Sequence, residues 1–542
     1  MSAYLKHTVL FHIVPDANVM IFLLIALTVG LFTALRIYGW TRNYIKACSY
    51  GLPIIVLPVS FNEPLWMLFR PLFTWVEYLP FGLGNWYLYT TMGWPTEDNA
   101  RSVSLYGENF ILCSPVDNTI VTCEPAVTNK VWTETRDIWR MPPAQSQLFT
   151  FFGQNVSSTH GDDWKRHRKV TVQAFSERTM AGVWGEARRQ TKGLKQSLEV
   201  ESERHLGRVR STFDVLAMQV LTVIAWGQQA GIDGVPAGHA MSLMESMGFI
   251  LKHILLTVVF NSLRVPDFLL PRTLQKLKLS VKEVRLYMQE LVLAHMQSSK
   301  PAQRLGTRPA TLLSAIVAAN EAEKDGNEGK PRSYLTDSEL YGNIFVFNLG
   351  GYETTAGTLT FALPYLALNP SIQDWVAEEI LSRTNSSHET DSDDYGEVYP
   401  TLLRTRALMY EVLRHASPAP LFVKTPLVPV SLTLTTPTGP RTINVDPGTL
   451  VGMNQYGAHL SPRWGANSHS FDPRRFINMS PDGSPNGEEK FVVPEDVAYT
   501  AWMIGPRMCP AKKFSQVEFA GIMVELLREW RVEVVRREGE IF

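Results

Sequence analysis

An uncharged run near the start of the chain restricts the fold more than any other feature of the sequence. It extends from Val19 to Leu35, reads VMIFLLIALTVGLFTAL, and is followed by Arg36. A helix needs roughly 20 apolar residues to cross the hydrocarbon core of a bilayer, so this run is just long enough. A cleaved signal peptide is disfavoured, because the run lies far from Met1 and precedes no small-x-small cleavage site. We therefore expect one N-terminal transmembrane helix within an anchor of residues 1–40.

Charged residues on the two sides of this run predict its orientation. Arg36, Arg42 and Lys46 follow it, whereas Lys6 and Asp16 precede it. Positive charge collects on the cytoplasmic side of membrane helices, so the bulk of the chain is expected in the cytosol. The cysteines agree with a reducing compartment, because the chain has only 4 of them and no CxxC pair.

The charge balance and the patterning of the remaining chain limit its partners and its fold class. The formal net charge is −1, and the absence of a basic excess argues against a nucleic-acid partner. Beyond about residue 100 the pattern is mostly helical, with short strand-like pieces and no internal repeat. The apolar stretch 51–86 is broken by prolines, so we expect it to contact the membrane surface rather than to span the bilayer.

The middle of the chain predicts one long helix with an unusual centre. It extends from Leu335 to Leu366, and Thr336 and Glu339 form a capping-box pattern at its start. Its centre reads NLGGYETT, and two glycines inside a helix cost roughly 1 kcal/mol each relative to alanine. One explanation is a kink or close helix packing. The other is a flat group that approaches the backbone there, with acid and hydroxyl groups aimed at it.

Three charged residues in apolar surroundings predict a buried ionic cluster. Glu411 and Arg414 in YEVLRH share one helix face, and Arg475 lies in FDPRRF. An isolated pair of this kind is usually a weak surface feature. A glutamate between two arginines would instead form a buried, fully hydrogen-bonded clamp.

A lone cysteine near the end of the chain follows a Gly-Pro pair and has basic neighbours. Cys509 lies in WMIGPRMCPAKKF, from Trp502 to Phe514, and the earlier segment WKRHRK contains Trp164 and Arg168. By itself such a cysteine would be interpreted as a buried structural residue. Together with the long helix and the ionic cluster, however, these segments resemble the cytochrome P-450 family of haem-thiolate monooxygenases.

The resemblance implies a fold and a set of site residues. Residues 41–542 would form a mainly α catalytic domain with small β-sheets, preceded by the transmembrane helix. Cys509 would be the axial ligand of the haem iron, because a thiolate favours O–O cleavage. Glu353 and Thr354 would relay protons, and Glu411, Arg414 and Arg475 would form the structural triad. Further haem contacts are implied for Arg507, Gly505, Trp502, Trp164, Arg168, Lys424 and Gly351, with His459 as an additional candidate.

Some features depart from the family pattern. Trp502 stands where the family usually has phenylalanine, and Ala511 where it usually has glycine. An indole N–H can donate toward the thiolate, which leads to the hypothesis that Trp502 raises the reduction potential. The chain ends soon after its last predicted helix, at RVEVVRREGEIF, so we expect a shortened C-terminal end.

Aromatic residues are the expected lining of the substrate pocket. The candidate segments are 145–157, 345–351 and 419–423, with Phe149, Phe151, Phe152, Phe347 and Phe422. For each single phenylalanine, ordinary core is an equal alternative. The apolar stretch 248–270 is either a lid that dips into the bilayer or a core helix and turn.

The function implied by the resemblance is oxidation of a lipophilic small molecule with O₂ and electrons that NADPH-cytochrome P-450 reductase passes on from NADPH. Lys165, Arg166 and Lys169 either dock such an acidic donor or are solvated surface. We expect a single-pass protein of the endoplasmic reticulum membrane that faces the cytosol. Resemblance to fungal tailoring enzymes favours secondary metabolism. Two alternatives stay open, a reductase-independent haem-thiolate isomerase or dehydratase and a non-catalytic membrane haem protein.

Overall fold

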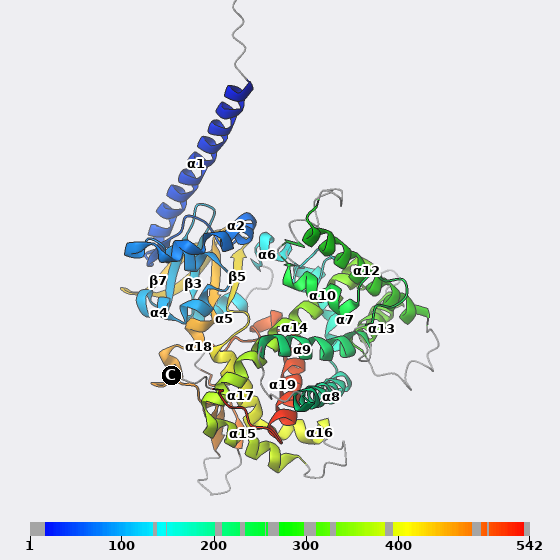
Figure 1. The fold of residues 1–542 in the computed structure, drawn as a ribbon. Coiled ribbons are helices and arrows are strands. Elements are labelled where there is room, and N and C mark those ends of the chain that lie inside the picture. The colour runs from blue at the N-terminus through cyan, green and yellow to red at the C-terminus, as the bar shows by residue number, and fades with distance from the viewer. Residues whose placement is uncertain are drawn as a thin grey trace, which may run out of the picture.

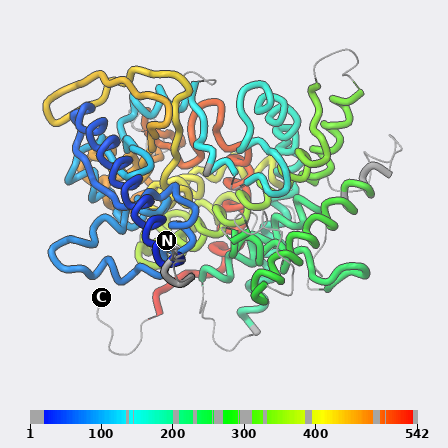
Figure 2. The backbone as a smooth tube through the Cα atoms, turned by 90° about the horizontal axis from the view of Figure 1, so that it is seen from above, coloured from blue at the N-terminus to red at the C-terminus, as the bar shows by residue number. Residues whose placement is uncertain are grey.

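The structure is a computed structural model, and it describes residues 17–133, 138–147, 149–200, 209–227, 234–254, 256–257, 270–297, 311–325, 332–384, 394–479, 489–495 and 498–535. A single helix projects from a body that has a large helical part and a smaller part built on β-sheets (Figure 1). Seen from above, the N-terminal segments lie on one side of the body and helices from the middle of the chain on the other (Figure 2). The expected mainly α fold with small sheets is confirmed.

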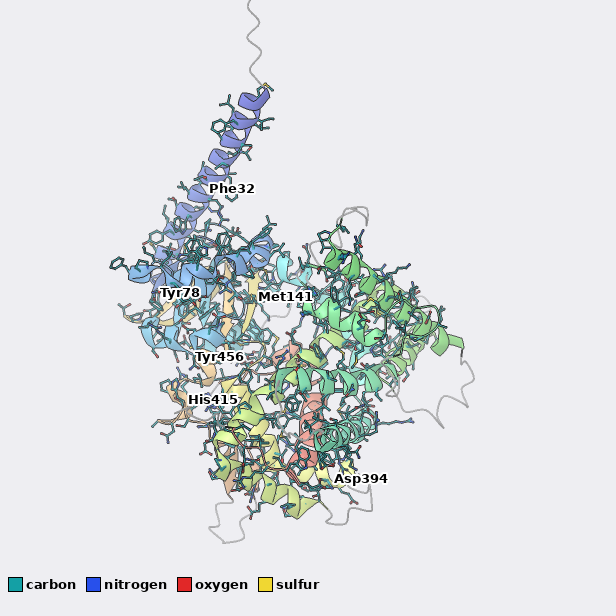
Figure 3. All side chains as sticks on the ribbon, in the orientation of Figure 1. Phe32, Tyr78, Met141, Asp394, His415 and Tyr456 are labelled. Carbon is teal, nitrogen blue, oxygen red and sulfur yellow. The ribbon has the colours of Figure 1, made fainter. Side chains whose placement is uncertain are left out.

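The projecting helix is α1 (Ala17–Tyr50), and it is long and apolar enough to cross a membrane by length and composition. Side chains along its outer part, such as Phe32, point away from the rest of the chain (Figure 3). The boundary expected at residue 40 falls inside this helix, because its last turns pack on the body. Asn43 Nδ2 donates to the Ser114 carbonyl at 2.9 Å. Arg36, which ends the apolar run, pairs with Glu63 at 2.6 Å.

The helical part surrounds one large apolar core, in which Phe213, Phe345 and Phe519 are fully buried. Its helices are α7 (Gly161–Thr171), α8 (Glu177–Val200), α9 (Val209–Trp226), α10 (Leu243–Lys252), α12 (Arg272–Gln297), α13 (Leu312–Asp325), α14 (Asp337–Leu368), α15 (Pro370–Arg383), α16 (Tyr395–Val398), α17 (Leu403–His415) and α19 (Lys512–Leu527). Shorter helices elsewhere are α2 (Pro64–Phe69), α3 (Trp94–Asp98), α4 (Arg101–Tyr106), α5 (Pro125–Trp132), α6 (Pro143–Gln147) and α18 (Gln455–His459). Of the stretch 248–270, expected to form either a lid or a core helix and turn, most residues lie outside the described part of the chain.

The largest sheet carries one wall of the site. Its strand order is β1 (Ile54–Val56), β2 (Asn109–Cys113), β3 (Asn118–Thr122), β8 (Leu450–Asn454), β5 (Leu421–Pro426) and β4 (Trp139–Arg140). β3 and β8 run parallel with Ile120 opposite Val451, and β5 runs antiparallel to β8 with Phe422 opposite Met453. Two hairpins complete the strands: β6 (Val430–Thr436) with β7 (Gly439–Val445), and β9 (Ile477–Met479) with β10 (Glu489–Phe491).

The stretch 51–86 folds into short pieces rather than a long helix. It contains β1, α2 and the 3₁₀ helix Arg70–Tyr78, and none of its helices is long enough to span a bilayer. Several of its apolar side chains face outward, among them Leu72 at 70% exposed, Tyr78 at 83% and Phe81 at 98%. Such a surface is consistent with the predicted contact with the membrane surface, which stays a prediction.

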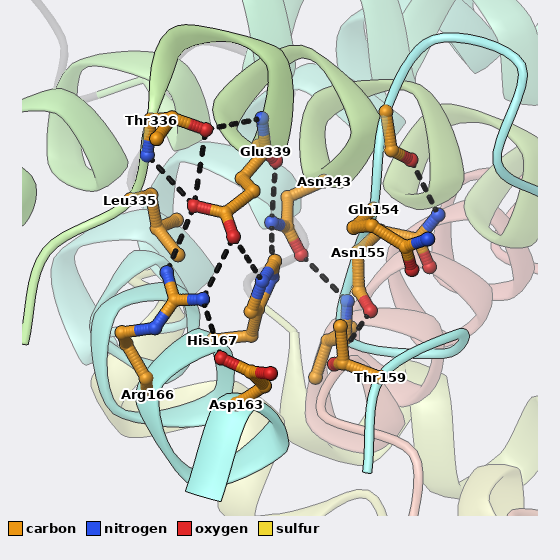
Figure 4. A network of polar contacts seen from close by, with 12 residues as sticks. Gln154, Asn155, Thr159, Asp163, Arg166, His167, Leu335, Thr336, Glu339 and Asn343 are labelled. Atoms are coloured by element: carbon orange, nitrogen blue, oxygen red, sulfur yellow. Dashed lines mark hydrogen bonds and ion pairs between the residues drawn. The ribbon is translucent and has the colours of Figure 1, made fainter.

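The predicted long helix is confirmed as α14, and its capping box is formed. Glu339 Oε2 accepts from the Thr336 backbone N–H at 2.8 Å, and Thr336 Oγ1 accepts from the Glu339 N–H at 3.3 Å. The same carboxylate joins α14 to α7, because Arg166 donates to both its oxygens at 2.7 and 2.8 Å (Figure 4). Asn343 extends the contact by a 2.8 Å bond to His167. This network fixes α7, which carries Trp164, against α14.

Replacing Glu339 with glutamine is expected to destabilise the fold at neutral pH by about 2 kcal/mol, the value of hydrogen bonds to a charged group. Burial acts to raise the pKa of Glu339, but its bonds from Arg166 and Thr336 lower that pKa to about 2. Because the folded pKa lies below the usual glutamate value of 4.5, the stabilising contribution of Glu339 is present above pH 4.5 and is lost as pH falls toward 2. Guanidinium unfolding from pH 7 down to about 2.5 should show that the difference in free energy of unfolding between the two proteins narrows below pH 4.5.

The control for this measurement is Asp163→Asn. Asp163 pairs with the same guanidinium at 2.8 Å, but its side chain is 68% exposed. An exposed pair contributes less than about 1 kcal/mol. Equal losses in the two variants would contradict the argument from burial.

Candidate active site

The cysteine loop is held against the body by its own backbone. The Cys509 N–H donates to the Trp502 carbonyl at 2.9 Å, and residues Gly505–Arg507 form one 3₁₀ turn between them. Gly505 has φ +71°, and a Cβ at this position would lie 2.5 Å from the Trp132 carbonyl oxygen. Only glycine permits both the backbone angle and the close approach. As the sequence indicates, α19 begins shortly after the cysteine, at Lys512.

The sulfur of Cys509 is partly buried and lies near positive charge. Burial raises the pKa of the Cys509 thiol, whereas the Ala511 backbone N–H, Arg168 and Lys512 act to lower it. Positive charge near the sulfur would favour a thiolate there, and a metal ion bound at the sulfur would favour it further.

A cavity of about 760 Å³ lies beside this loop. Pro506, Arg507 and Pro510 of the loop line it, together with Trp164 and Arg168 from α7. Cys509 lines a second cavity, which shares Arg168 and Pro510 with the first. Met141, also in the wall, lies between the sheet part and the helical part (Figure 3). Cys509 thus lines the second cavity, while its neighbours in the loop line the first.

Several cations around the cavity have no acidic partner in the part of the chain that the structure describes. Arg507 donates to the carbonyls of Val156 and Thr159 at 3.1 and 2.6 Å, and its guanidinium lies 4.8 Å from the centre of the Trp164 ring. Lys424 donates to a carbonyl at 3.1 Å. Burial and the Arg507 charge lower the pKa of Lys424 to about 7, and burial and Arg168 lower that of Arg507 to about 10.

These cations test whether a haem fits the site. Within the described residues, no carboxylate forms an ion pair with Arg168, Lys424 or Arg507. These cations are partly buried, and desolvated cations without counter-charge are costly, so a group with two carboxylates would relieve the site. Haem carries two propionates, and the loop of Cys509 lines the same cavity through Pro506, Arg507 and Pro510. The residues present therefore fit a haem.

The centre of α14 contributes less to the cavity than the sequence suggests. Glu353 is exposed and lines it. The Thr354 hydroxyl donates back to the Gly350 carbonyl at 2.7 Å, and Thr354 is absent from the cavity wall. Gly351, expected as a haem contact, faces α9 instead, because a Cβ there would lie 3.1 Å from Leu221. Close helix packing therefore explains Gly351, whereas a Cβ on Gly350 would meet open space.

The three charged residues of the predicted triad meet in one buried cluster. Glu411 and Arg414 are both 0% exposed and form two bonds of 2.8 Å, and Arg475 Nε reaches the same carboxylate at 3.1 Å. Arg414 also donates to the His459 carbonyl at 2.8 Å. Burial acts to raise the pKa of Glu411, but the bonds from Arg414 and His415 lower it to about 2. The carboxylate is thus ionised and fully paired.

Several expectations about side chains near the site are wrong. The Trp502 indole N–H does not donate toward the sulfur, because it donates to Ser515 Oγ at 3.0 Å. The hypothesis of a raised reduction potential therefore loses its geometric basis. Arg166 cannot dock an electron donor, because its side chain is 7% exposed and pairs with Glu339. His459 is fully buried, accepts from the Thr500 N–H at 3.0 Å, and lies outside the cavity wall.

The phenylalanines divide between pocket and core. Phe149 and Phe422 line the cavity, as does the whole segment Ala419–Val423. Phe151 and Phe152 pack on Phe345 with ring centres 4.6 and 4.8 Å apart, and Phe347 packs on Phe175. Phe151, Phe152 and Phe347 do not line the cavity, so for these three the core alternative holds. No residue of the segment 345–351 lines the cavity, so the expectation that this segment lines the substrate pocket is wrong.

His160 is a site residue that the sequence analysis missed. It lines the cavity, and its Nδ1 lies 3.3 Å from an Arg507 nitrogen. Burial and the Arg507 charge lower the pKa of His160 to about 4, so the ring is neutral. Its place at the N-cap of α7, four residues before Trp164, is the signal that would have identified it.

Comparison with known proteins assigns this architecture to a family. Residues 103–541 match the family model described as Cytochrome P450. A cytochrome P450 monooxygenase of Arthrobotrys oligospora is 26% identical, covering 93% of this chain and 90% of the relative. The phomenoic acid biosynthesis cluster cytochrome P450 monooxygenase of Leptosphaeria maculans is 27% identical, covering 94% and 92%. The crystal structure of a cytochrome P450 matches with a TM-score of 0.62 at 16% identity, covering 82% of this chain and 90% of that one, which supports the fold.

Proposed function

Because this chain belongs to the cytochrome P450 family, we propose that it is a haem-thiolate monooxygenase that oxidises a lipophilic small molecule with O₂ and electrons from NADPH. The observation that carries the proposal is the meeting of the cysteine loop with a cavity whose partly buried cations have no acidic partner among the described residues. Haem would supply the oxygen activation, and the cations would hold its propionates.

The residues of the chain would divide the work. Cys509 would bind the iron, and Trp164, Arg168, Lys424 and Arg507 would hold the propionates. Trp502, 9% exposed, would cover the sulfur side and keep water away, even though its N–H is engaged by Ser515. Gly505 would let the loop lie flat. Gly351, which packs on Leu221, has no place in this set.

Proton supply would come from α14. Glu353 is the acid of this helix that lines the cavity, and it would exchange protons with water there. Thr354 would hold a proton donor in place by releasing its bond to the Gly350 carbonyl. An intact acid–hydroxyl pair favours a monooxygenase over a reductase-independent isomerase.

Replacing Thr354 with alanine is expected to lower the product formed per NADPH oxidised by about tenfold, the effect of one hydrogen bond of about 1.4 kcal/mol. Hydrogen peroxide release should rise correspondingly, while haem content stays unchanged. The matched control is Thr358→Ala, one turn further along α14, where the hydroxyl donates to the Thr354 carbonyl at 2.8 Å. If Thr354→Ala leaves the product ratio at the wild-type value, Thr354 has no part in proton supply.

The substrate, the partner and the location are also proposed. Phe149 and Phe422 give the cavity an apolar lining, which suits a lipophilic substrate. Arg406 and Lys512 line the cavity on the sulfur side, where they would attract the acidic surface of a reductase. α1 would anchor the protein in the endoplasmic reticulum membrane with the body in the cytosol. The likeness to a monooxygenase of the phomenoic acid cluster favours secondary metabolism.

The deciding experiment is the carbon monoxide difference spectrum of the reduced protein, for wild type and Cys509→Ala. A strongly red-shifted Soret band in wild type, absent from the variant, supports thiolate-ligated haem. Product formation should then require both NADPH and reductase. A histidine-like band or no haem in wild type would favour a non-catalytic protein.

A further inference from the structure

A buried acid on α19 has no partner in the structure. Glu518 is 1% exposed, and neither of its carboxyl oxygens has a hydrogen-bond partner among the described residues. An ionised carboxylate in such a position would be strongly destabilising. The buried acid further along the same helix differs, because Glu525 pairs with Arg188 at 3.2 Å.

The hydroxyl that faces Glu518 is also exceptional. Threonines inside helices usually donate to the carbonyl four residues earlier, and Thr354, Thr358 and Thr360 of α14 do so at 2.7, 2.8 and 2.7 Å. Thr355 is 1% exposed, and its hydroxyl has no partner among the described residues. It faces the Glu518 carboxyl instead. Two buried polar groups that face each other and have no other partner are satisfied most simply by bonding to one another.

We propose that Glu518 is a neutral carboxylic acid in the folded protein and that its hydrogen bond with Thr355 positions the Glu353–Thr355 turn of α14. A neutral carboxyl both donates and accepts, so it can satisfy the hydroxyl without a counter-charge. Glu518 touches neither substrate nor cofactor in this proposal and acts through Thr355.

Among the described residues, no charged group on the neighbouring helices contributes to the pKa of Glu518. The helices packed against α19 are α8, α14, α15 and α17. Among the charged groups that these helices carry are Glu177, paired with Lys513; Arg188 and Lys195, paired with Glu525; Glu379, bonded to Thr405; Glu411 with Arg414; Arg406, over Phe491; and Glu353, in the cavity wall. Burial raises the pKa of Glu518 to about 8 and the Thr355 hydroxyl acts to lower it, with no charged neighbour contributing.

The pair connects two parts of the site. α19 follows the loop of Cys509, and the turn of α14 next to Thr355 carries Glu353 and Thr354. A bond between Glu518 and Thr355 therefore sets the distance between the thiolate side and the proton-supplying side. This consequence rests on the proposed monooxygenase function, whereas the neutrality of Glu518 does not.

The first test measures thermal unfolding of the full chain from pH 5 to 9 for wild type, Glu518→Gln and Glu525→Gln. Because the folded pKa lies above the usual glutamate value of 4.5, the folded state holds the extra proton and wild type loses stability as pH rises from 4.5 toward 8. Glutamine cannot ionise. The melting temperature of Glu518→Gln should therefore rise relative to that of wild type across this pH window, by roughly 2 °C or more at its upper end. Glu525→Gln should instead lose stability at every pH.

An infrared spectrum gives the second readout of neutrality. Wild type at pH 7 should show the carbonyl band of a protonated carboxyl that Glu518→Gln lacks. The proposal that Glu518 is neutral would be wrong if the difference in melting temperature between wild type and Glu518→Gln did not depend on pH. It would also be wrong if the carbonyl band were the same in both proteins. Both outcomes are independent of whether the protein is a monooxygenase.

The role of Glu518 in positioning the Glu353–Thr355 turn is tested by the amount of product formed per NADPH oxidised. Glu518→Leu and Thr355→Val should each lower product per NADPH by about threefold or more, whereas Glu518→Gln restores it, because the amide keeps a donor and an acceptor. If Glu518 had a purely structural role, the loss of product per NADPH in each variant would follow its loss of folding stability. If Glu518→Gln is as uncoupled as Glu518→Leu, or if both stay coupled, the positioning role is wrong. Should Glu518→Leu fail to fold, Thr355→Val decides.

Discussion

Glu411→Ala is expected to leave little folded protein. The substitution removes the negative charge that pairs with Arg414, which is 0% exposed, and with Arg475. Breaking a buried ion pair by removing one partner costs about 3–5 kcal/mol. Whole domains are stable by only about 5–15 kcal/mol, so a loss of this size removes a large share of the margin. Guanidinium unfolding and the yield of soluble, haem-containing protein measure the effect.

The control for Glu411 is Glu378→Ala. Glu378 also pairs with an arginine, Arg404, at 2.7 Å, but its side chain is 73% exposed. An exposed pair of this kind contributes less than about 1 kcal/mol. If Glu411→Ala does not fold at all, Glu411→Gln, which keeps part of the hydrogen bonding, should give a measurable intermediate loss. Equal effects at Glu411 and Glu378 would mean that burial of the cluster does not matter.

Gly505→Ala is expected to weaken haem binding by roughly tenfold, because a left-handed backbone costs a residue with a Cβ about 1–2 kcal/mol. The added carbon would also lie 2.5 Å from the Trp132 carbonyl and 3.0 Å from Thr133 Cα, both of them backbone atoms. The loop must then move outward and carry Arg507 and Cys509 with it. Haem bound per protein, with the carbon monoxide difference spectrum, measures the result.

Gly448→Ala separates backbone strain from collision. Gly448 has φ +86°, close to that of Gly505, but a Cβ there has nothing within 4 Å. This variant should lose stability by about 1 kcal/mol and bind haem as wild type does. Haem loss of the same size in both variants would show that general destabilisation, not movement of the loop, is the cause.

Much of the architecture could be predicted because its determinants are local. A capping box at Thr336 and Glu339 and an unbroken helical pattern predict α14 within a few residues. An uncharged run predicts a helix like α1, although not its continuation to Tyr50, because that part is held by contacts such as Asn43 with Ser114. The motifs around Cys509 also indicated the family that the comparison over residues 103–541 then showed.

The side-chain environment of the site could not be predicted in the same way. Helical spacing shows that Glu411 and Arg414 share a face, but it does not show which face of α14 meets the cavity and which meets α9. Gly351 was expected at the haem and packs on Leu221 instead. Arg166 was expected at the surface and is buried, because Glu339, distant in sequence, lies against it.

By itself the sequence determined most of the long helices, the apolar N-terminal helix and the family motifs, because periodicity, caps and motifs depend on neighbours a few positions apart. Only the tertiary structure decided which side chains meet. It turned the Trp502 indole toward Ser515, assigned Phe151 and Phe152 to the core, and brought Glu518 to Thr355. Each of these contacts depends on how distant segments pack, and burial then sets the charge and the partner of every polar group enclosed between them.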